Sequence, residues 1–301
     1  MAYEYGPIVV GVDGSADSTG AVRWAADEAC RWTRTLVAVH AVEPGEPAKP
    51  AEPGQPGPAG GADIAAAAAA EARRWCVGVA ATGETRAGPP VDVLRQMAEQ
   101  ARLLVVGGRG TSRHPTAPLG PVSRALAARA GAPVLVVHNA RRWASPDAVL
   151  PRDGPVVVGF DGSDSAGRAL RLAFAEAAAR CSRLVILQAW QHLELWRPGG
   201  DRAADLCDNA TVVHESLCAV AQPWRARYPL VEVEIRGEPG DPVMALTTAS
   251  QWAGLLVLGT RCPADPVQPS RPSVSSRVLR YAACPVLVAH GPSRVPAAAA
   301  A

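Results

Sequence analysis

Short apolar runs alternate with longer alanine-rich stretches along this chain. The runs at 8–12, 36–39, 103–106 and 134–137 carry Val, Leu and Ile on successive positions, which is typical of strands buried on both faces of a parallel sheet. Between the first two runs, Ala21, Trp24, Ala25 and Glu28 share one helical face. Strands that alternate with helices predict βαβ crossovers and an open α/β sheet covered on both faces.

The pattern of the first half returns in the second half. Two blocks recur 148 positions later and two recur 152 positions later, in the same order: PIVVGVDGS and PVVVGFDGS, TLVAVHA and RLVILQA, LLVVGGR and LLVLGTR, APVLVVH and CPVLVAH. Four ordered repeats indicate a tandem duplication. We expect domains at 1–140 and 154–292, a linker at 139–154, a disordered tail at 293–301, and a mobile Pro- and Gly-rich loop at 43–61.

Composition narrows the class of protein. With 301 residues, 48% hydrophobic residues and a net charge of +2, the chain resembles a globular protein of two domains. A net charge so near zero gives no sign of the basic surface that nucleic-acid binding requires. The N-terminus lacks a secretory pattern and no apolar stretch is long enough to span a bilayer, so we expect a cytoplasmic protein without a membrane partner.

Seven widely spaced cysteines without a CxxC pair predict neither a disulfide framework nor a zinc site. We expect most of them to be reduced, partly buried and packed as small apolar residues.

The candidate chemistry lies where strands end. Gly107, Gly110 and Gly120 precede a helix-like segment, and such an arrangement can offer close backbone approach and free amides to a phosphate. Neither the Walker form nor the dinucleotide form of glycine loop occurs. Asp13 ends the first strand and can accept bonds from a base or a ribose. The alternative is that Asp13 belongs to a turn, with Ser15 or Asp17 capping the next helix.

The DGS motif, the Gly107-x2-Gly110-x9-Gly120 spacing, the helix lead-in VSRAL and the closing strand APVLVV together resemble the universal stress protein family in its tandem form. The resemblance covers nearly the whole chain. It implies two five-stranded, adenine-nucleotide alpha-hydrolase-like domains that pair through their last strands, 134–137 and 286–288. It also implies ATP or AMP, with or without Mg²⁺, at the strand carboxyl ends.

Carried over by position, the resemblance assigns Asp13 to the adenine end, the Val39 backbone to the base, and the three loop glycines with Val122 and Ser123 to the ribose and phosphates. The family has Ser or Thr where this chain has Pro121, which lacks an N–H and a hydroxyl, so we expect a weakened first site. Arg109 either contacts a phosphate or is solvated. His114 has the same two readings, and His40 is expected to be structural.

The second half keeps some of these positions and loses others. The corresponding residues are Asp161, Leu187, Gly259, Arg261, Ser273, Val274 and Ser275. Cys262 and Pro272 replace the second and third glycines, and a Cβ where a glycine conformation is needed costs about 1–2 kcal/mol. We expect a degenerate second site. His138 and His290 end the closing strands symmetrically, and we expect them to line the domain interface.

Three functions remain open from the sequence. The first is a nucleotide-dependent stress-response regulator that acts on an unidentified protein partner and can form a homodimer. The second is a slow ATP hydrolase, although the sequence shows no poised base, loop lysine or metal cluster, and no catalytic residue is assigned. The third is a scaffold that no longer binds nucleotide.

Overall fold

The computed structural model describes residues 5–43, 61–110, 118–138, 154–190, 202–260 and 273–290. The Pro- and Gly-rich loop, most of the linker and the C-terminal tail lie outside these residues. The strands are β1 Ile8–Gly11, β2 Leu36–Val42, β3 Ala81–Ala87, β4 Leu103–Gly107, β5 Val134–Val137, β6 Val156–Gly159, β7 Leu184–Trp190, β8 Val233–Pro239, β9 Leu255–Gly259 and β10 Val286–Ala289.

The helices are α1 Ala16–Arg31, α2 Gly61–Trp75, α3 Pro90–Ala98, α4 Pro121–Arg129, α6 Asp164–Ala179, α7 Arg202–Arg227, α8 Pro242–Ala249 and α9 Val274–Tyr281. The helix predicted from the first alanine-rich stretch is present as α1, and its four predicted core positions are all buried. The side chain of Ser15 accepts a hydrogen bond from the Ser18 amide and caps this helix.

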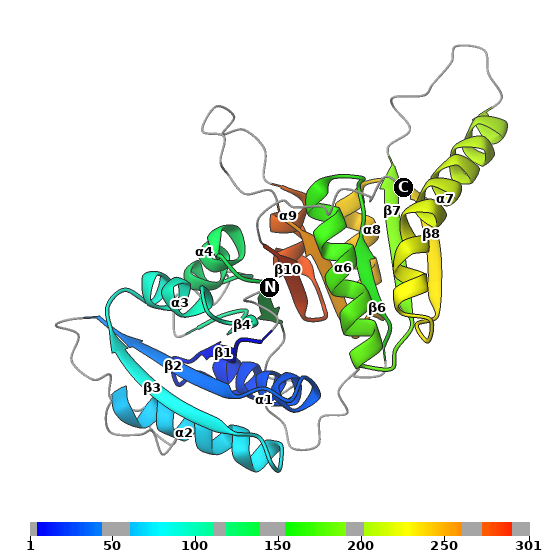
Figure 1. The fold of residues 1–301 in the computed structure, drawn as a ribbon. Helices are drawn as coiled ribbons and strands as arrows, with labels where there is room; N and C mark the ends of the chain where they lie inside the picture. Colours follow the sequence, from blue (N-terminus) through cyan, green and yellow to red (C-terminus); the bar gives the residue numbers. More distant parts are fainter. Residues whose placement is uncertain are drawn as a thin grey trace.

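The strands form one continuous sheet in the order β3-β2-β1-β4-β5-β10-β9-β6-β7-β8 (Figure 1). Neighbouring strands are parallel within each half, and β5 and β10 are antiparallel, with Val136 opposite Val286 and Leu135 opposite Leu287. The predicted pairing through the last strands is therefore confirmed. It covers two valine-rich edges that would otherwise expose unpaired backbone.

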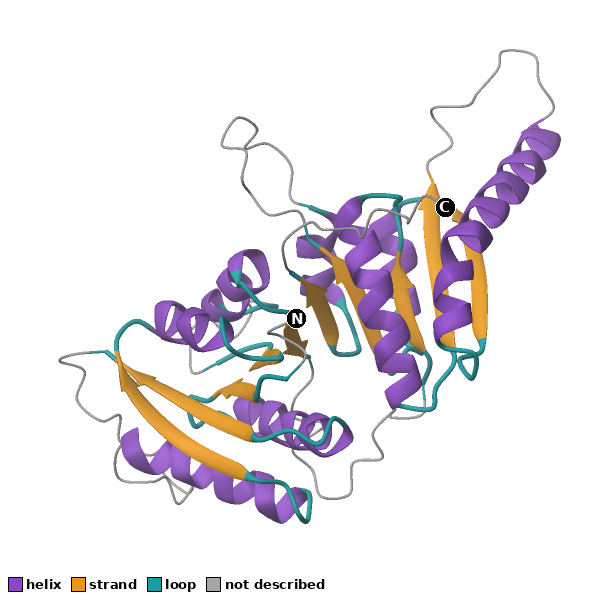
Figure 2. Cartoon of the chain, in the orientation of Figure 1, coloured by secondary structure: helices purple, strands orange, loops and turns teal. Residues whose placement is uncertain are grey.

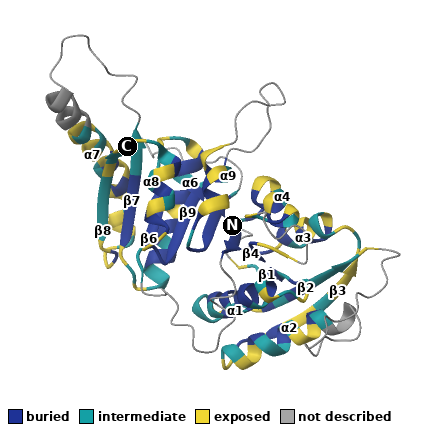
Figure 3. Cartoon of the chain, turned by 180° about the vertical axis from the view of Figure 1, so that it is seen from behind, coloured by how far each residue is buried: buried dark blue, intermediate teal, exposed yellow. Residues whose placement is uncertain are grey.

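Helices cover both faces of the sheet (Figure 2). One core layer joins α1, α2, α6 and α7 to the sheet, and the other joins α3, α4, α8 and α9. The central strands are almost entirely buried (Figure 3), which explains why their sequences are continuous apolar runs rather than alternating ones.

The halves also meet through charged groups, which the sequence pattern does not indicate. Arg180, after α6, forms ion pairs with Glu28 of α1 and with Glu176 of its own helix. Glu28 and Glu176 occupy equivalent positions of the repeat, and both are buried. Burial lowers the pKa of Arg180, but the two carboxylates outweigh this effect and hold the pKa above its usual value.

The pairing of the closing strands brings the two histidines to the interface, as expected. His138 Nε2 lies 2.6 Å from the carbonyl oxygen of Leu279 in α9, and His290 lies near the backbone of Ala127 in α4. Burial lowers the pKa of His138, and it lowers the pKa of His290 to about 4. Both imidazoles therefore stay neutral in the folded protein near neutral pH.

The carboxyl of Glu176 makes stability depend on pH. Burial and the neighbouring Glu28 raise its pKa from 4.5 to about 7 against the opposing charges of Arg180, Arg102 and Arg31. The folded chain holds this proton more tightly than the unfolded chain, so this contribution to stability is present below pH 4.5 and is lost as pH rises through 7. We expect Glu176→Gln to flatten the decline of the melting temperature between about pH 5 and 8. Superimposable profiles for both proteins would contradict this assignment.

Candidate functional site

Three segments that are far apart in sequence converge at the carboxyl edge of the first half of the sheet. The backbone amide of Arg109, after β4, donates to Asp17 Oδ2 in α1 at 3.0 Å. The amide of Gly120, before α4, donates to the carbonyl of Gly108 at 2.8 Å. A Cβ built on Gly110 would lie 2.5 Å from Asp13 Oδ2. The structure thus brings the β1–α1 loop, the β4 loop and the amino end of α4 together.

Asp13 has a structural contact and also faces the loop. Its Oδ1 accepts hydrogen bonds from the amide of Ser15 at 3.0 Å and from the Ser15 hydroxyl at 2.6 Å. The turn reading of Asp13 is therefore correct for this oxygen, while Oδ2 points toward Gly110. Gly14, between Asp13 and Ser15, has a φ of +79°, which favours glycine. This requirement was not predicted from the sequence, although DGS recurs around Gly162, whose φ is +78°.

The reason for the loop glycines differs from the expected one. Gly110 does not have a positive φ, so the expectation of a glycine conformation there is wrong. A Cβ there would lie 2.5 Å from Oδ2 at the end of the Asp13 side chain, so a larger residue would have to displace this carboxylate. Gly107 is crowded by backbone instead, since its Cβ would lie 2.9 Å from the carbonyl oxygen of Asp17. Gly120 has an ordinary φ of −68° and only normal contacts.

Helix α4 presents its amino end to this edge. Pro121 occupies the first turn, as expected, and the cap residue Gly120 offers no side-chain hydrogen bond. Arg124 makes the first backbone bond within the helix, to Gly120 at 3.0 Å, so the amides of Val122 and Ser123 precede the helical ladder. The hydroxyl of Ser123 is buried and donates to the carbonyl of Gly107 at 2.6 Å. Its side chain therefore stabilises the loop.

The remaining predicted site residues include backbone groups that are already hydrogen-bonded, one exposed arginine, and residues outside the described part of the chain. The carbonyl of Val39 accepts a hydrogen bond from Val12 at 2.9 Å, and that of Leu187 accepts one from Phe160 at 2.9 Å. His40 Nδ1 lies 2.8 Å from the carbonyl oxygen of Val12, so it has the expected structural contact. Arg109 is exposed. His114, Arg261, Cys262 and Pro272 are outside the described residues.

The second half repeats the turn, but other positions of the site carry different residues. Asp161 Oδ1 accepts from the amide of Ser163 at 3.0 Å, as Asp13 does from Ser15. However, Ser165 occupies the position of Asp17. Thr260, which is buried, occupies the position of Gly108. Ser273 caps α9 by accepting from the Ser276 amide at 3.2 Å, and Val274 and Ser275 follow it in the first turn.

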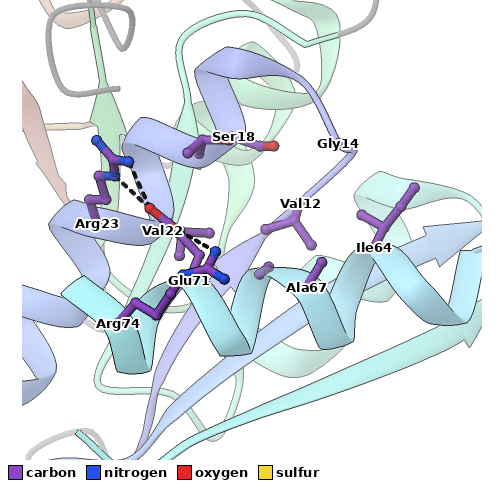
Figure 4. Close-up of a pocket in the computed structure, with 11 residues that line it drawn as sticks. Val12, Gly14, Ser18, Val22, Arg23, Ile64, Ala67, Glu71 and Arg74 are labelled. Atoms are coloured by element: carbon purple, nitrogen blue, oxygen red, sulfur yellow. Dashed lines mark hydrogen bonds and ion pairs between the residues drawn. The ribbon is translucent and has the colours of Figure 1, made fainter. Parts of the chain in front are cut away.

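A separate pocket of about 260 Å³ lies between α1 and α2 (Figure 4). Val12, Val22, Ile64 and Ala67 give it an apolar lining, and an ion pair between Arg23 and Glu71 at 2.8 Å borders it. The pocket touches the strand edge only through Val12 and Gly14. Its volume is below the roughly 300–1,000 Å³ usual for ligand pockets, so we place the candidate site at the strand edge.

Two classes of feature are absent from the described part of the chain. Among its residues, no group of three or more His, Cys, Asp or Glu side chains is arranged to hold a metal ion. Within the same residues, no helix has both the length and the apolar character needed to cross a membrane.

A disulfide that the spacing of the cysteines did not predict lies within the described residues. Cys30 and Cys76 are joined by a disulfide, because α1 and α2 pack side by side and bring residues 46 positions apart together. Cys181, Cys218 and Cys284 are free thiols, and Cys284 is buried.

Comparison with known proteins places both halves in one family. The model of the universal stress protein family matches residues 4–138 and again residues 154–290. A universal stress protein of Mycobacterium tuberculosis is 33% identical over 297 residues, covering 94% of this chain and 95% of its own length. One of Mycolicibacterium smegmatis is 32% identical over 295 residues, covering 95% of this chain and 97% of its own.

A solved structure supports the same assignment of fold. The universal stress protein of Archaeoglobus fulgidus superposes with a TM-score of 0.66 at 20% identity, covering 95% of this chain and 98% of that one. Two matches in tandem, relatives above 30% identity and a shared fold agree. The chain therefore belongs to the universal stress protein family, with two of its domains in one polypeptide.

Proposed function

We propose that the first domain binds an adenine nucleotide, ATP or AMP, along the carboxyl edge of its strands. The observation that carries the proposal is the convergence of Asp13 Oδ2, the Gly107–Gly110 loop and the amino end of α4. Parallel α/β sheets bind their ligands at this edge. The amides of Val122 and Ser123 suit a phosphate, and Asp13 suits the donor groups of a base or ribose.

The crowding at Gly110 supports this assignment. The loop backbone lies so close to the carboxylate of Asp13 that even a methyl group would displace one of them. A nucleotide can therefore contact loop backbone and carboxylate together. Mg²⁺ would bind together with the nucleotide phosphates, since no side chain of the site is assigned as its ligand.

We propose that the second domain does not bind nucleotide with comparable affinity. Thr260 adds a side chain where the first domain has Gly108, and Ser165 lacks the carboxylate with which Asp17 holds the Arg109 amide. Cys262 likewise adds a side chain where the first domain has Gly110.

We assign no catalytic group. The output that fits these residues is a population shift, in which bound nucleotide orders the loops and changes the surface offered to a protein partner or to a second copy of the chain. The cytoplasm is the compartment we propose for this role.

The substitution Asp13→Ala tests the site, and the repeat supplies a matched control. We expect nucleotide affinity to fall about ten- to a hundredfold, because a hydrogen bond to a charged group is worth about 1.5–3 kcal/mol. Asp161→Ala removes the same contact with a serine amide in the second half, so it should cost similar stability but leave affinity unchanged. Equal affinity losses in both variants, or none in Asp13→Ala, would overturn the proposal. Calorimetry and thermal unfolding provide the two readouts.

Pro121→Ser tests the effect of the missing donor at α4. If a backbone N–H and a hydroxyl at this position reach the phosphate, affinity should rise by a similar factor. In the second half Ser273 uses its hydroxyl to cap α9. A gain in stability without a gain in affinity would therefore show that the new serine caps α4 instead, and would contradict the expected role of the donor.

A further inference from the structure

The two halves hold corresponding helix pairs in different ways. In the second half, Phe174 of α6 stacks on Trp224 of α7 at 6.1 Å between ring centroids, and on Tyr228 at 5.9 Å. The repeat places Ala26, Ala72 and Cys76 at the equivalent positions of the first half. Small side chains therefore replace these three aromatic rings between α1 and α2.

Alanine provides most of the buried face of α2. Ala65, Ala69 and Ala72 are its buried residues next to α1 and the sheet, and each buries little more than one methyl group. A few polar contacts add to this packing: the ion pair of Arg23 with Glu71, and the Trp75 indole, which donates to Asp27 at 3.2 Å. Arg23 also lies over the Trp75 ring, 4.6 Å from its centroid, and the disulfide between Cys30 and Cys76 adds a covalent link at the end of α2.

Cys30 and Cys76 are partly exposed residues, unlike Cys284. Cys30 and Cys76 are partly buried at the edge of the core, and Cys76 precedes a turn in which Val77 is 94% exposed. Cys284 is buried, and this burial raises the pKa of its thiol to about 12. Cys30 and Cys76 are joined to each other and are both partly exposed, so an exchange partner has access to this pair that it lacks at Cys284.

We propose that Cys30 and Cys76 form a reversible redox clamp that fixes α2 to α1 when oxidised and releases the end of α2 when reduced. The oxidant is a low-molecular-weight disulfide. One protein thiolate attacks it to give a mixed disulfide and release one thiol, and the second protein thiolate then displaces the second. The two cysteines lose two electrons and two protons, and the small disulfide becomes two thiols. Excess thiol drives the reverse reaction.

The clamp acts on the helix that borders the nucleotide edge. Ile64, in the first turns of α2, lies 3.6 Å from the position of a Cβ on Gly14, and α2 forms one wall of the pocket in Figure 4. The disulfide closes a segment of 46 residues, which includes the long connection between β2 and α2. Closing a segment of this length restricts the freedom of the open state substantially.

The test uses the full chain without nucleotide, so that its result does not depend on the proposed function. The protein is equilibrated with glutathione and glutathione disulfide at graded ratios, free thiols are alkylated, and the modified peptides are identified by mass. Hydrogen exchange is then followed in residues 61–75, with residues 210–227 of α7 as the internal reference. We expect Cys30 and Cys76 to become protected together and reversibly, and reduction to speed exchange in α2 about tenfold without affecting α7.

Two variants complete the experiment. The double variant Cys30→Ser, Cys76→Ser should exchange like the reduced chain at every ratio, while Cys181→Ser, which removes an exposed free thiol, should behave like the parent chain. Glutathione attached to only one of the two cysteines, or an internal disulfide that leaves exchange in α2 unchanged, would overturn the proposal.

Discussion

Arg180→Met is expected to lower the free energy of unfolding by about 3–5 kcal/mol, the largest effect of any substitution considered for this chain. The guanidinium is 8% exposed and pairs with Glu28, which is 1% exposed, and with Glu176. Without it, Glu176 loses this buried partner, and Glu28 keeps only its ion pair with Arg31 at 2.8 Å, whose side chain is 22% exposed, among the ion pairs of the described residues. Urea unfolding monitored by far-UV circular dichroism measures the loss.

A surface pair provides the control for this prediction. Arg183 pairs with Glu234 at 3.0 Å, but both side chains are substantially exposed, so Arg183→Met should cost less than about 1 kcal/mol. Adding Glu28→Gln and Glu176→Gln to Arg180→Met should recover much of the stability, because no buried charge is then left without a partner. A small loss for Arg180→Met, equal to that of the control, would contradict a buried interface cluster.

Gly259→Ala is expected to destabilise the second domain by about 1–3 kcal/mol through overpacking. A Cβ there would lie 2.5 Å from both the carbonyl carbon and the oxygen of Ser165 in α6, and backbone cannot move as a side chain can. The same substitution at Gly107 meets backbone at 2.9 Å and should cost less. Thermal and urea unfolding of the two variants gives the order.

Gly131→Ala is the matched control for this series. A Cβ at Gly131 would meet nothing within 4 Å and its φ is not in the glycine-favoring region, so the substitution should be neutral or slightly stabilising. If Gly259→Ala were as neutral as Gly131→Ala, the close approach of β9 to α6 would be contradicted.

The fold could be predicted because its signals are local and repeated. Runs of valine and leucine indicate strands buried on both faces, and β5 has the bounds predicted from its sequence, Val134–Val137. The repeat indicated two equivalent halves. The pairing of β5 with β10 came from the family resemblance, since an apolar run alone does not specify which strand lies beside it.

The sequence predicted the positions of the candidate site but not the contacts that explain its glycines. Proximity of Asp13 to Gly110 depends on how two loops meet across the sheet edge, and the spacing of glycines does not reveal it. The need for glycine at position 110 was therefore predicted from backbone conformation, whereas the positive φ is at Gly14. The bond between Asp17 and the Arg109 amide likewise joins residues 92 positions apart.

Contacts between elements could not be predicted from a single sequence. Glu28 was placed correctly on the buried face of α1, but its partner Arg180 comes from the other half of the chain. Cys30 and Cys76 have no motif spacing that marks them as a pair, and only the packing of α2 on α1 brings them together. Such contacts depend on tertiary structure rather than on local pattern.

Nucleotide binding by the first domain is tested by calorimetric titration of the nucleotide-stripped protein with ATP in the presence of Mg²⁺. We expect saturable binding of about one ATP per chain, with the first domain occupied and the second empty. Two equivalent sites would contradict the distinction drawn between the two strand edges. Absence of binding, confirmed by a second method, would contradict nucleotide recognition by this chain altogether.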